Sequence, residues 1–191
     1  MKKSIGAKTF LGAVPLLVIG SYDRKERPNL ATVAWGGICC SEPPCVNISL
    51  RKNRYSYHNI LARQAFTVNI LFGDRVKEAD FYGLISGEKH DKFEMSGITP
   101  IKSDLVDAPY GKEFPLVLEC KVIHTLEIGV HTEFVGEILD IKAEDYLLDE
   151  RGKIDTGKLD PILYTPEAGE YYGRGDYLGR SYKIGKSIIS E

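Results

Sequence analysis

Ser49-Leu50-Arg51-Lys52-Asn53-Arg54-Tyr55-Ser56 joins a predicted strand to a predicted helix. The preceding residues, Cys45 to Leu50, alternate between apolar and polar side chains, which predicts a half-buried strand. Ser56 can cap a short helix that reaches about Gln64. A helix N-terminus presents free N–H groups and a partial positive charge, so it favours anions. The stretch therefore predicts a phosphate-binding site.

The side chains of this stretch suit the same ligand. Arg51 or Arg54 can donate bidentate hydrogen bonds to a phosphate. Ser49 and Ser56 can supply hydroxyl donors. A solvated basic turn with an ordinary helix cap is the alternative, and the residues alone leave both interpretations open.

A second stretch, Asn29-Leu30-Ala31-Thr32-Val33-Ala34-Trp35-Gly36-Gly37, suits a flat ring. Its small side chains let a ring approach the backbone closely, and Trp35 can stack against it. We expect Gly36-Gly37 to interrupt the strand and permit a tight exit. The alternative is a core strand whose tryptophan packs inside.

The rest of the chain predicts many strands and few helices. We expect further strands over 16–22, 65–71, 115–128 and 132–142, a helix capped by Asp74, a loop over 87–100 and an irregular tail from Asp160. We find no repeat and no linker. The pattern predicts one domain, 1–191, built as a β-barrel with attached helices.

Composition and charge exclude several function classes. The 25 basic and 27 acidic residues give a net charge of -2, so no basic field favours nucleic acid. No apolar run reaches the roughly 18 residues of a membrane span. Lys2 and Lys3 precede an apolar run as in a signal peptide, but Lys8 and Pro15 interrupt that pattern. We expect a cytoplasmic protein.

The four cysteines are Cys39, Cys40, Cys45 and Cys120. They form no C-x-x-C pair, and no histidine lies at zinc-ligand spacing, so we expect no metal site. We expect buried thiols in a reducing compartment. A redox or metal role for Cys40 and Cys45 remains open as the alternative.

Five motifs, taken in order, resemble one family. They are residues 29–37, Cys39-Cys40-Ser41 leading to Pro43-Pro44-Cys45, residues 49–57, Gly87-Glu88-Lys89-His90-Asp91-Lys92-Phe93, and His131-Thr132-Glu133-Phe134-Val135-Gly136-Glu137. The chain resembles the flavin reductase-like proteins of the FMN-binding split-barrel superfamily, in particular flavoredoxins and archaeal ferric reductases. The likeness runs from about Lys8 to Lys183.

The resemblance implies a mainly β fold, a six-stranded antiparallel Greek-key split barrel with a few flanking helices. It implies a homodimer that binds FMN non-covalently near the dimer interface. Asn29 and the 31–35 strand would contact the isoalloxazine, and Ser49, Arg51, Ser56 and Lys92 would hold the phosphate side. The implied cofactor-binding residues are Asn29, Ala31, Thr32, Val33, Ala34, Trp35, Ser49, Leu50, Arg51, Tyr55, Ser56, Lys92 and Tyr164.

His131 is the one catalytic residue that the resemblance implies. It would lie near the flavin face where nicotinamide docks and would orient the nicotinamide or help move a proton. A strand-end histidine that hydrogen-bonds backbone is the alternative. The tail tyrosines, Tyr164, Tyr171 and Tyr172, would cover the site, either from the same chain or from the partner subunit.

The implied activity is electron transfer. NAD(P)H would give a hydride to FMN N5, and flavin, ferric iron or a protein would accept the electrons. The chain has no G-x-G-x-x-G fingerprint at the start of a βαβ unit, so NAD(P)H would bind transiently in a shared cleft. Two alternatives remain: an electron carrier without direct NAD(P)H activity, and a split-barrel module that binds a ligand without turnover.

Overall fold

The computed structural model describes residues 1–189, and its centre is a seven-stranded antiparallel sheet in the order β3-β2-β6-β9-β10-β5-β4. Its strands are β2 Leu17–Tyr22, β3 Pro28–Val33, β4 Gly36–Ser41, β5 Pro44–Arg51, β6 Ala65–Ile70, β9 Leu116–Ile128 and β10 His131–Ala143. The chain crosses from β5 to β6, which pairs with β2, and β10 returns to pair with β5. The mainly β, antiparallel split-barrel class is confirmed.

The two edge strands of this sheet, β3 and β4, are consecutive in the chain. Only Ala34 and Trp35 separate them. In a flat sheet the edges would lie about 28 Å apart, whereas two residues bridge only about 10 Å. The sheet must therefore curl until its edges meet. The Ser49 amide donates to the Trp35 carbonyl over 2.8 Å, which ties the short connection to β5.

The strand count corrects the expected six. Gly36-Gly37, expected to interrupt a strand, instead begins β4. A Cβ on Gly36 would lie 2.7 Å from the Asn47 carbonyl oxygen of the neighbouring strand. Close approach between strands therefore explains this glycine, and a turn does not.

The helices do not begin where the sequence predicts: α1 begins earlier, α2 begins later, and α3 is an additional helix. Helix α1 spans Tyr55–Arg63, and its N-cap is Arg54, with Ser56 already inside the first turn. Helix α2 spans Val76–Leu84, and Asp74 lies in the preceding 3₁₀ turn, Gly73–Arg75, instead of capping it. Helix α3, Lys92–Ser96, lies in the segment expected to be a loop.

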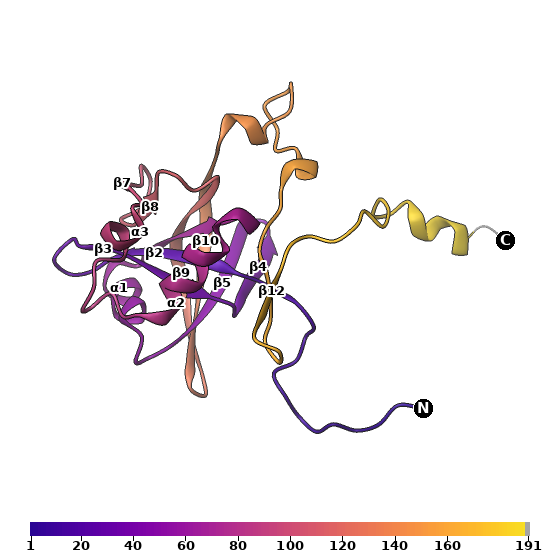
Figure 1. The fold of residues 1–191 in the computed structure, drawn as a ribbon, viewed down its shortest axis with the longest axis horizontal. Coiled ribbons are helices and arrows are strands. Elements are labelled where there is room, and N and C mark those ends of the chain that lie inside the picture. The colour runs from indigo at the N-terminus through magenta and orange to yellow at the C-terminus, as the bar shows by residue number, and fades with distance from the viewer. Residues whose placement is uncertain (190–191) are drawn as a thin grey trace.

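Short elements complete the fold. The tail that was expected to be irregular contributes β11 Leu163–Thr165 and β12 Glu170–Tyr172, which form a three-stranded sheet with β1 Val14–Pro15. The remaining elements are β7 Pro100–Lys102, β8 Pro109–Gly111 and the 3₁₀ helices Asp145–Leu147, Thr156–Lys158 and Ile184–Ile188. The N-terminal segment and the C-terminal tail extend away from the barrel on the same side (Figure 1). Among residues 1–189, no helix is both long and apolar enough to cross a membrane.

Two apolar cores lie on the two faces of the sheet. Leu17 and Ile19 of β2 point into the barrel, where they join Phe66 and Phe134. Val18 of the same strand points outward and packs with the residues of α2 and α3. Because both faces are buried, β2 is apolar at nearly every position. The barrel and its helices are thus held as one packed unit.

We predict that Gly20→Ala destabilises the fold. Gly20 lies in β2, where a Cβ would meet the Pro109 carbonyl oxygen at 2.0 Å and Thr67 Oγ1 at 2.4 Å. Overpacking of this kind costs about 1–3 kcal/mol. Urea unfolding should show that loss, while the matched variant Gly37→Ala, with nothing within 4 Å of the new methyl group, should stay near wild type. Equal midpoints for the two variants would contradict the packing argument.

Candidate functional site

A groove runs along the seam where the barrel closes. Its first part is a cavity of about 280 Å³ between β3, the start of α1 and the segment after α2. Its second part, about 330 Å³, lies between the end of β3, the end of β5 and the start of β10. Thr32, Leu50 and Arg54 line both parts, so the groove is continuous. Cavities of about 300–1,000 Å³ are typical of small-molecule sites.

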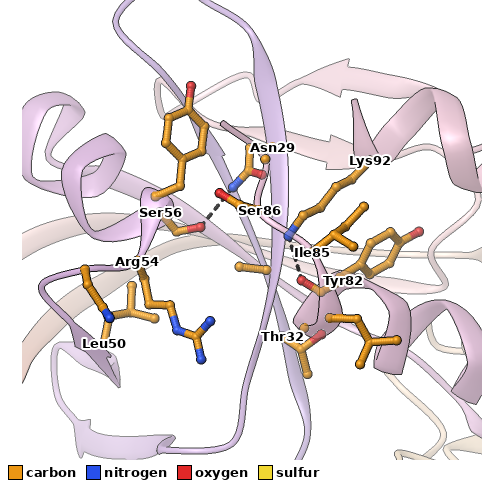
Figure 2. Close-up of a pocket in the computed structure, with 15 residues that line it drawn as sticks. Asn29, Thr32, Leu50, Arg54, Ser56, Tyr82, Ile85, Ser86 and Lys92 are labelled. Carbon is orange, nitrogen blue, oxygen red and sulfur yellow. Dashed lines mark hydrogen bonds between the residues drawn. The ribbon is translucent and has the colours of Figure 1, made fainter. Parts of the chain in front are cut away.

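Asn29 and Ser56 meet at the wall of the first cavity. The Asn29 amide nitrogen donates to Ser56 Oγ over 2.9 Å, and both residues are buried (Figure 2). The carboxamide oxygen of Asn29 has no partner among residues 1–189. The Ser56 hydroxyl proton is also uncommitted, because its oxygen acts there as the acceptor. Both groups therefore have hydrogen-bonding capacity that no described residue uses.

The segment between α2 and α3 closes this cavity against Asn29. A Cβ on Gly87 would lie 1.7 Å from Asn29 Oδ1 and 3.3 Å from Tyr55 Cδ1. Only glycine permits this approach of the backbone. Ser86 and Gly87 therefore bring main-chain and hydroxyl groups to the cavity wall.

Lys92 brings a buried cation to the first cavity. It is only 3% exposed, and its ammonium group donates to the carbonyl oxygens of Leu30 at 2.8 Å and Tyr82 at 2.6 Å. An ammonium has three donors, so one remains for a ligand. Burial, and next the charge of Arg54, lower the pKa of Lys92 to about 8.

Arg54 is the second cation at this end. Its exposed side chain makes no hydrogen bond or ion pair within residues 1–189, and it lines both parts of the groove. The first amides of α1, at Tyr55 and Ser56, have no acceptor inside the helix. Two mutually repelling cations and a helix N-terminus therefore face one cavity, and an anion bound there would relieve the repulsion.

A buried carboxylate holds the start of α1 in place. Asp23 accepts hydrogen bonds from the Tyr55 hydroxyl and Arg27 Nε, both at 2.7 Å, and from the amides of Lys25 and Arg27. Burial acts to raise the pKa of Asp23, but these hydrogen bonds outweigh it and lower the pKa to about 2. The β2–β3 turn is thereby tied to the residue that follows Arg54.

The second part of the groove offers a flatter, less polar surface. Ala34 and Trp35 form one wall, and His131 stands directly opposite Arg51 on the adjacent strand. The His131 ring makes no hydrogen bond among the described residues, so the alternative in which it bonds backbone is not seen. An apolar cavity of about 630 Å³ continues outward past Trp35 and His131 to Phe10 and Leu11.

The structure brings most of the expected site residues to the groove. The first part contains Asn29, Ala31, Thr32, Leu50, Tyr55, Ser56 and Lys92. The second contains Thr32, Val33, Ala34, Trp35, Ser49, Leu50, Arg51 and His131. The Val33 side chain belongs to the barrel core, so it faces away from a ligand.

The grouping of these residues differs from the expected one. Asn29, expected beside a ring, lies in the polar first part. Ser49 and Arg51, expected beside Ser56 at the phosphate, lie in the second part. Tyr164 lines neither part: it pairs with Val14 across β1 and β11, and its ring packs at a tilt against Tyr171, with 5.5 Å between the ring centroids.

The groove also contains residues that the expected set omits. They are Asn53, Arg54, Tyr82, Gly83, Leu84, Ile85, Ser86 and Gly87. Arg54 is an alternative that the phosphate stretch itself suggests, and Gly87 opens the fourth motif. The segment 82–86 has no chemical signature in the sequence, since it contributes mainly backbone.

Comparisons with known proteins agree with this fold and groove. The family model "Flavin reductase like domain" matches residues 12–167. The flavoredoxin of Desulfovibrio vulgaris (Miyazaki F) is 45% identical, with a TM-score of 0.91 over 97% of this chain and 100% of that one. The flavoredoxin of Methanosarcina acetivorans is 34% identical, with a TM-score of 0.91 over 98% and 99%. A ferric-chelate reductase (NAD(P)H) of Archaeoglobus fulgidus is 26% identical over 59% of this chain and 72% of its own.

The fold and the groove define a flavin-binding split barrel of the oxidoreductase type. The chain belongs to the flavin reductase-like domain family. The residues present fit a flavin cofactor: the unpartnered Asn29 oxygen suits a hydroxyl donor, the Gly87 approach shapes the wall, and Trp35 offers a face for a ring.

We predict a pH-dependent stability that originates at Lys92. Its folded pKa of about 8 lies below the ordinary 10.5, so between these values the unfolded state holds a proton that the folded state has released. Folding stability should therefore rise with pH across this window, by about 3 kcal/mol from this group. Urea unfolding of flavin-free protein across the window should show the rise in wild type and its loss in Lys92→Met. If the stability of wild type and of Lys92→Met changed with pH in parallel, the effect would not originate at Lys92.

Proposed function

We propose that the chain binds one FMN non-covalently along the groove, with the phosphate in the first part and the isoalloxazine in the second. The observation that carries this proposal is the meeting of Lys92, Arg54 and the α1 N-terminus at one cavity. These groups suit a phosphomonoester, which carries up to two negative charges and strong acceptor oxygens. The Ser56 hydroxyl supplies a further donor.

The remaining groove residues suit the rest of the cofactor. The Asn29 oxygen can accept from a ribityl hydroxyl. The backbone between Thr32 and Trp35 can bond the polar ring edge, and Trp35 can lie against the ring. Arg51, which is exposed, and His131, which is half-buried, also line that part. Their position there supports a role toward the ring or a second substrate.

We predict that Arg54→Ala weakens binding of FMN far more than binding of riboflavin, which lacks the phosphate. Loss of a charged hydrogen bond should reduce FMN affinity by about 10- to 100-fold. Fluorescence titration with both ligands measures the difference. Arg151→Ala, in a turn that lines no part of the groove, is the matched control.

The same titration on Arg51→Ala tests the orientation of the cofactor. Because Arg51 lies in the second part, we expect similar losses for FMN and riboflavin. An FMN-selective loss in Arg51→Ala, with none in Arg54→Ala, would place the phosphate at the opposite end from the one proposed.

The proposed activity is NAD(P)H-dependent reduction of flavin, ferric iron or a protein acceptor. Bound flavin would supply the hydride and electron chemistry. The chain's own residues would hold and orient the reactants: His131 at the mouth can orient a nicotinamide or hold a proton, and the apolar cavity beside Trp35 can exclude water. The similarity to a ferric-chelate reductase (NAD(P)H) supports this activity.

A second candidate is an electron carrier that another redox protein reduces. The 45% identity to a flavoredoxin over nearly the whole chain favours it. In both cases the groove and the cofactor are the same, and only the electron donor differs.

Anaerobic titration of the FMN-loaded protein with NADH and then NADPH separates these candidates. We expect the visible flavin absorption to bleach with at least one of them. Bleaching only by dithionite or a protein reductant would replace the reductase with the carrier. Failure to load FMN at all would refute both and leave a module that binds another ligand.

We further propose a homodimer. Leu126, Ile128 and Val130 are more than half exposed at the tip of the β9–β10 hairpin, and Tyr177 and Leu178 of the tail are exposed separately. A cluster of exposed apolar side chains such as the one at the hairpin tip marks an interaction surface. Light scattering that gives the mass of one chain, 21.3 kDa, would contradict the dimer.

A further inference from the structure

Three of the four cysteines gather near the turn of the β4–β5 hairpin. Cys39 and Cys40 lie on β4 and Cys45 lies on β5. Cys39 and Cys40 are exposed, which corrects the expectation of buried thiols, while Cys45 and Cys120 are buried. None of the three hairpin cysteines lines the flavin groove.

The strand register places Cys40 directly opposite Cys45. Opposed residues of antiparallel strands have Cα atoms about 4.5 or 5.5 Å apart, depending on the type of pair. A disulfide requires a Cα separation of about 4.4–6.8 Å. Either type of pair therefore meets this distance requirement.

The other cysteines are less well placed to pair with Cys45. Cys120 lies on β9, and β10 separates that strand from β5, so the two backbones are about 9.5 Å apart, beyond disulfide reach. Cys39 falls at a register shift between Ile38 and Cys40 and has no opposite residue on β5.

The thiol environments give the two partners different roles. Burial raises the pKa of the Cys45 thiol, and the neighbouring Cys40 and Cys39 raise it further. A thiol hydrogen bond between Cys40 and Cys45 acts in the same direction. Burial and then Glu133 raise the pKa of Cys39. Thiolates, not thiols, attack disulfides, so Cys39 and Cys45 are poorly suited to begin an exchange with a dilute reagent near neutral pH, whereas an attack by Cys45 on its paired residue Cys40 is intramolecular. Cys40 is the exposed member of the opposed pair and can meet a reagent from solution.

A metal site does not explain the cluster. Within residues 1–189, no group of three His, Cys, Asp or Glu side chains is arranged to hold a metal ion. Two opposed thiols without a third ligand are suited instead to reversible covalent chemistry with each other.

We propose that Cys40 and Cys45 form a redox-active dithiol that exchanges with low-molecular-weight aliphatic disulfides. The Cys40 thiolate attacks one sulfur of the disulfide RSSR, forms a Cys40–SR mixed disulfide and releases one RS⁻. The Cys45 thiolate then attacks Cys40 Sγ, closes the Cys40–Cys45 bond and releases the second RS⁻. The two thiol protons end on two RSH; the protein loses two electrons and RSSR gains them.

The Cys40–Cys45 pair lies outside the groove, so its chemistry is independent of the flavin. We expect a dithiol to reduce the Cys40–Cys45 bond easily. Exposed or strained disulfides have more oxidising potentials and are the labile ones. Cys40 is exposed on an edge strand, so a reductant can reach the bond.

The test counts thiols in the FMN-loaded full chain. The protein is first reduced with a phosphine, and the phosphine is then removed. The reduced protein is treated anaerobically with bis(2-hydroxyethyl) disulfide at about pH 8. After quenching, maleimide labelling and intact mass give the thiol number, and peptide mapping gives the link. We expect loss of two of the four thiols, a Cys40–Cys45 peptide, and recovery with dithiothreitol.

Three variants assign the roles. Cys39→Ser should still form the link. Cys45→Ala should stop at a mixed disulfide on Cys40, and Cys40→Ser, an exposed change that should not affect folding, should form no link. Four persistent thiols in wild type, loss of the link in Cys39→Ser, or a link between two chains on a non-reducing gel would each overturn the proposal.

Discussion

Closure of the sheet through two residues is the constraint on which the site depends. Because Ala34 and Trp35 alone connect the two edge strands, the barrel must bring β3 and β4 together at one seam. The backbones of β3 and β4 are not paired with each other at this seam, and the groove lies there. The hydrogen bond from the Ser49 amide to Trp35 holds the seam in register. The ligand site is therefore a consequence of how the sheet closes.

The first part of the groove combines features that a stability argument alone would disfavour. Lys92 is a buried cation with a lowered pKa, Arg54 has no charged partner in the described chain, and the Asn29 oxygen is buried without a donor. Burial of Lys92 and of the Asn29 oxygen costs folding free energy, and Arg54 adds repulsion toward Lys92. Their convergence on one cavity indicates that a ligand offsets these costs, since functional sites are where such local rules are broken.

The sequence predicted the strands well because their signals are local. Alternation and apolar runs located β2, β5, β6, β9 and β10 to within a few residues. Gly36-Gly37 suggested an interruption where β4 begins, because the contact that demands glycine at position 36 comes from Asn47, which only strand pairing brings close. Likewise, whether Arg51 or Arg54 joins Lys92 depends on the turn into α1, which propensity does not specify. The segment 82–86 contributes mainly backbone to the cavity wall, so its residue types do not predict a role in the site.

The two-residue connection also determines where this chain tolerates added length. An insertion after Ala34 would loosen the link between the barrel's edges and separate Trp35 from the rest of the groove wall. The turn at Gly152 differs, since it is exposed, has a positive φ of 71° and has no atom within 4 Å of the position that a Cβ would take. Exposed turns of this kind accept inserted domains and circular permutation. A reporter peptide or a new terminus should therefore be placed near Gly152. The two-residue spacing between Val33 and Gly36, in contrast, sets the width of the groove and should not be lengthened.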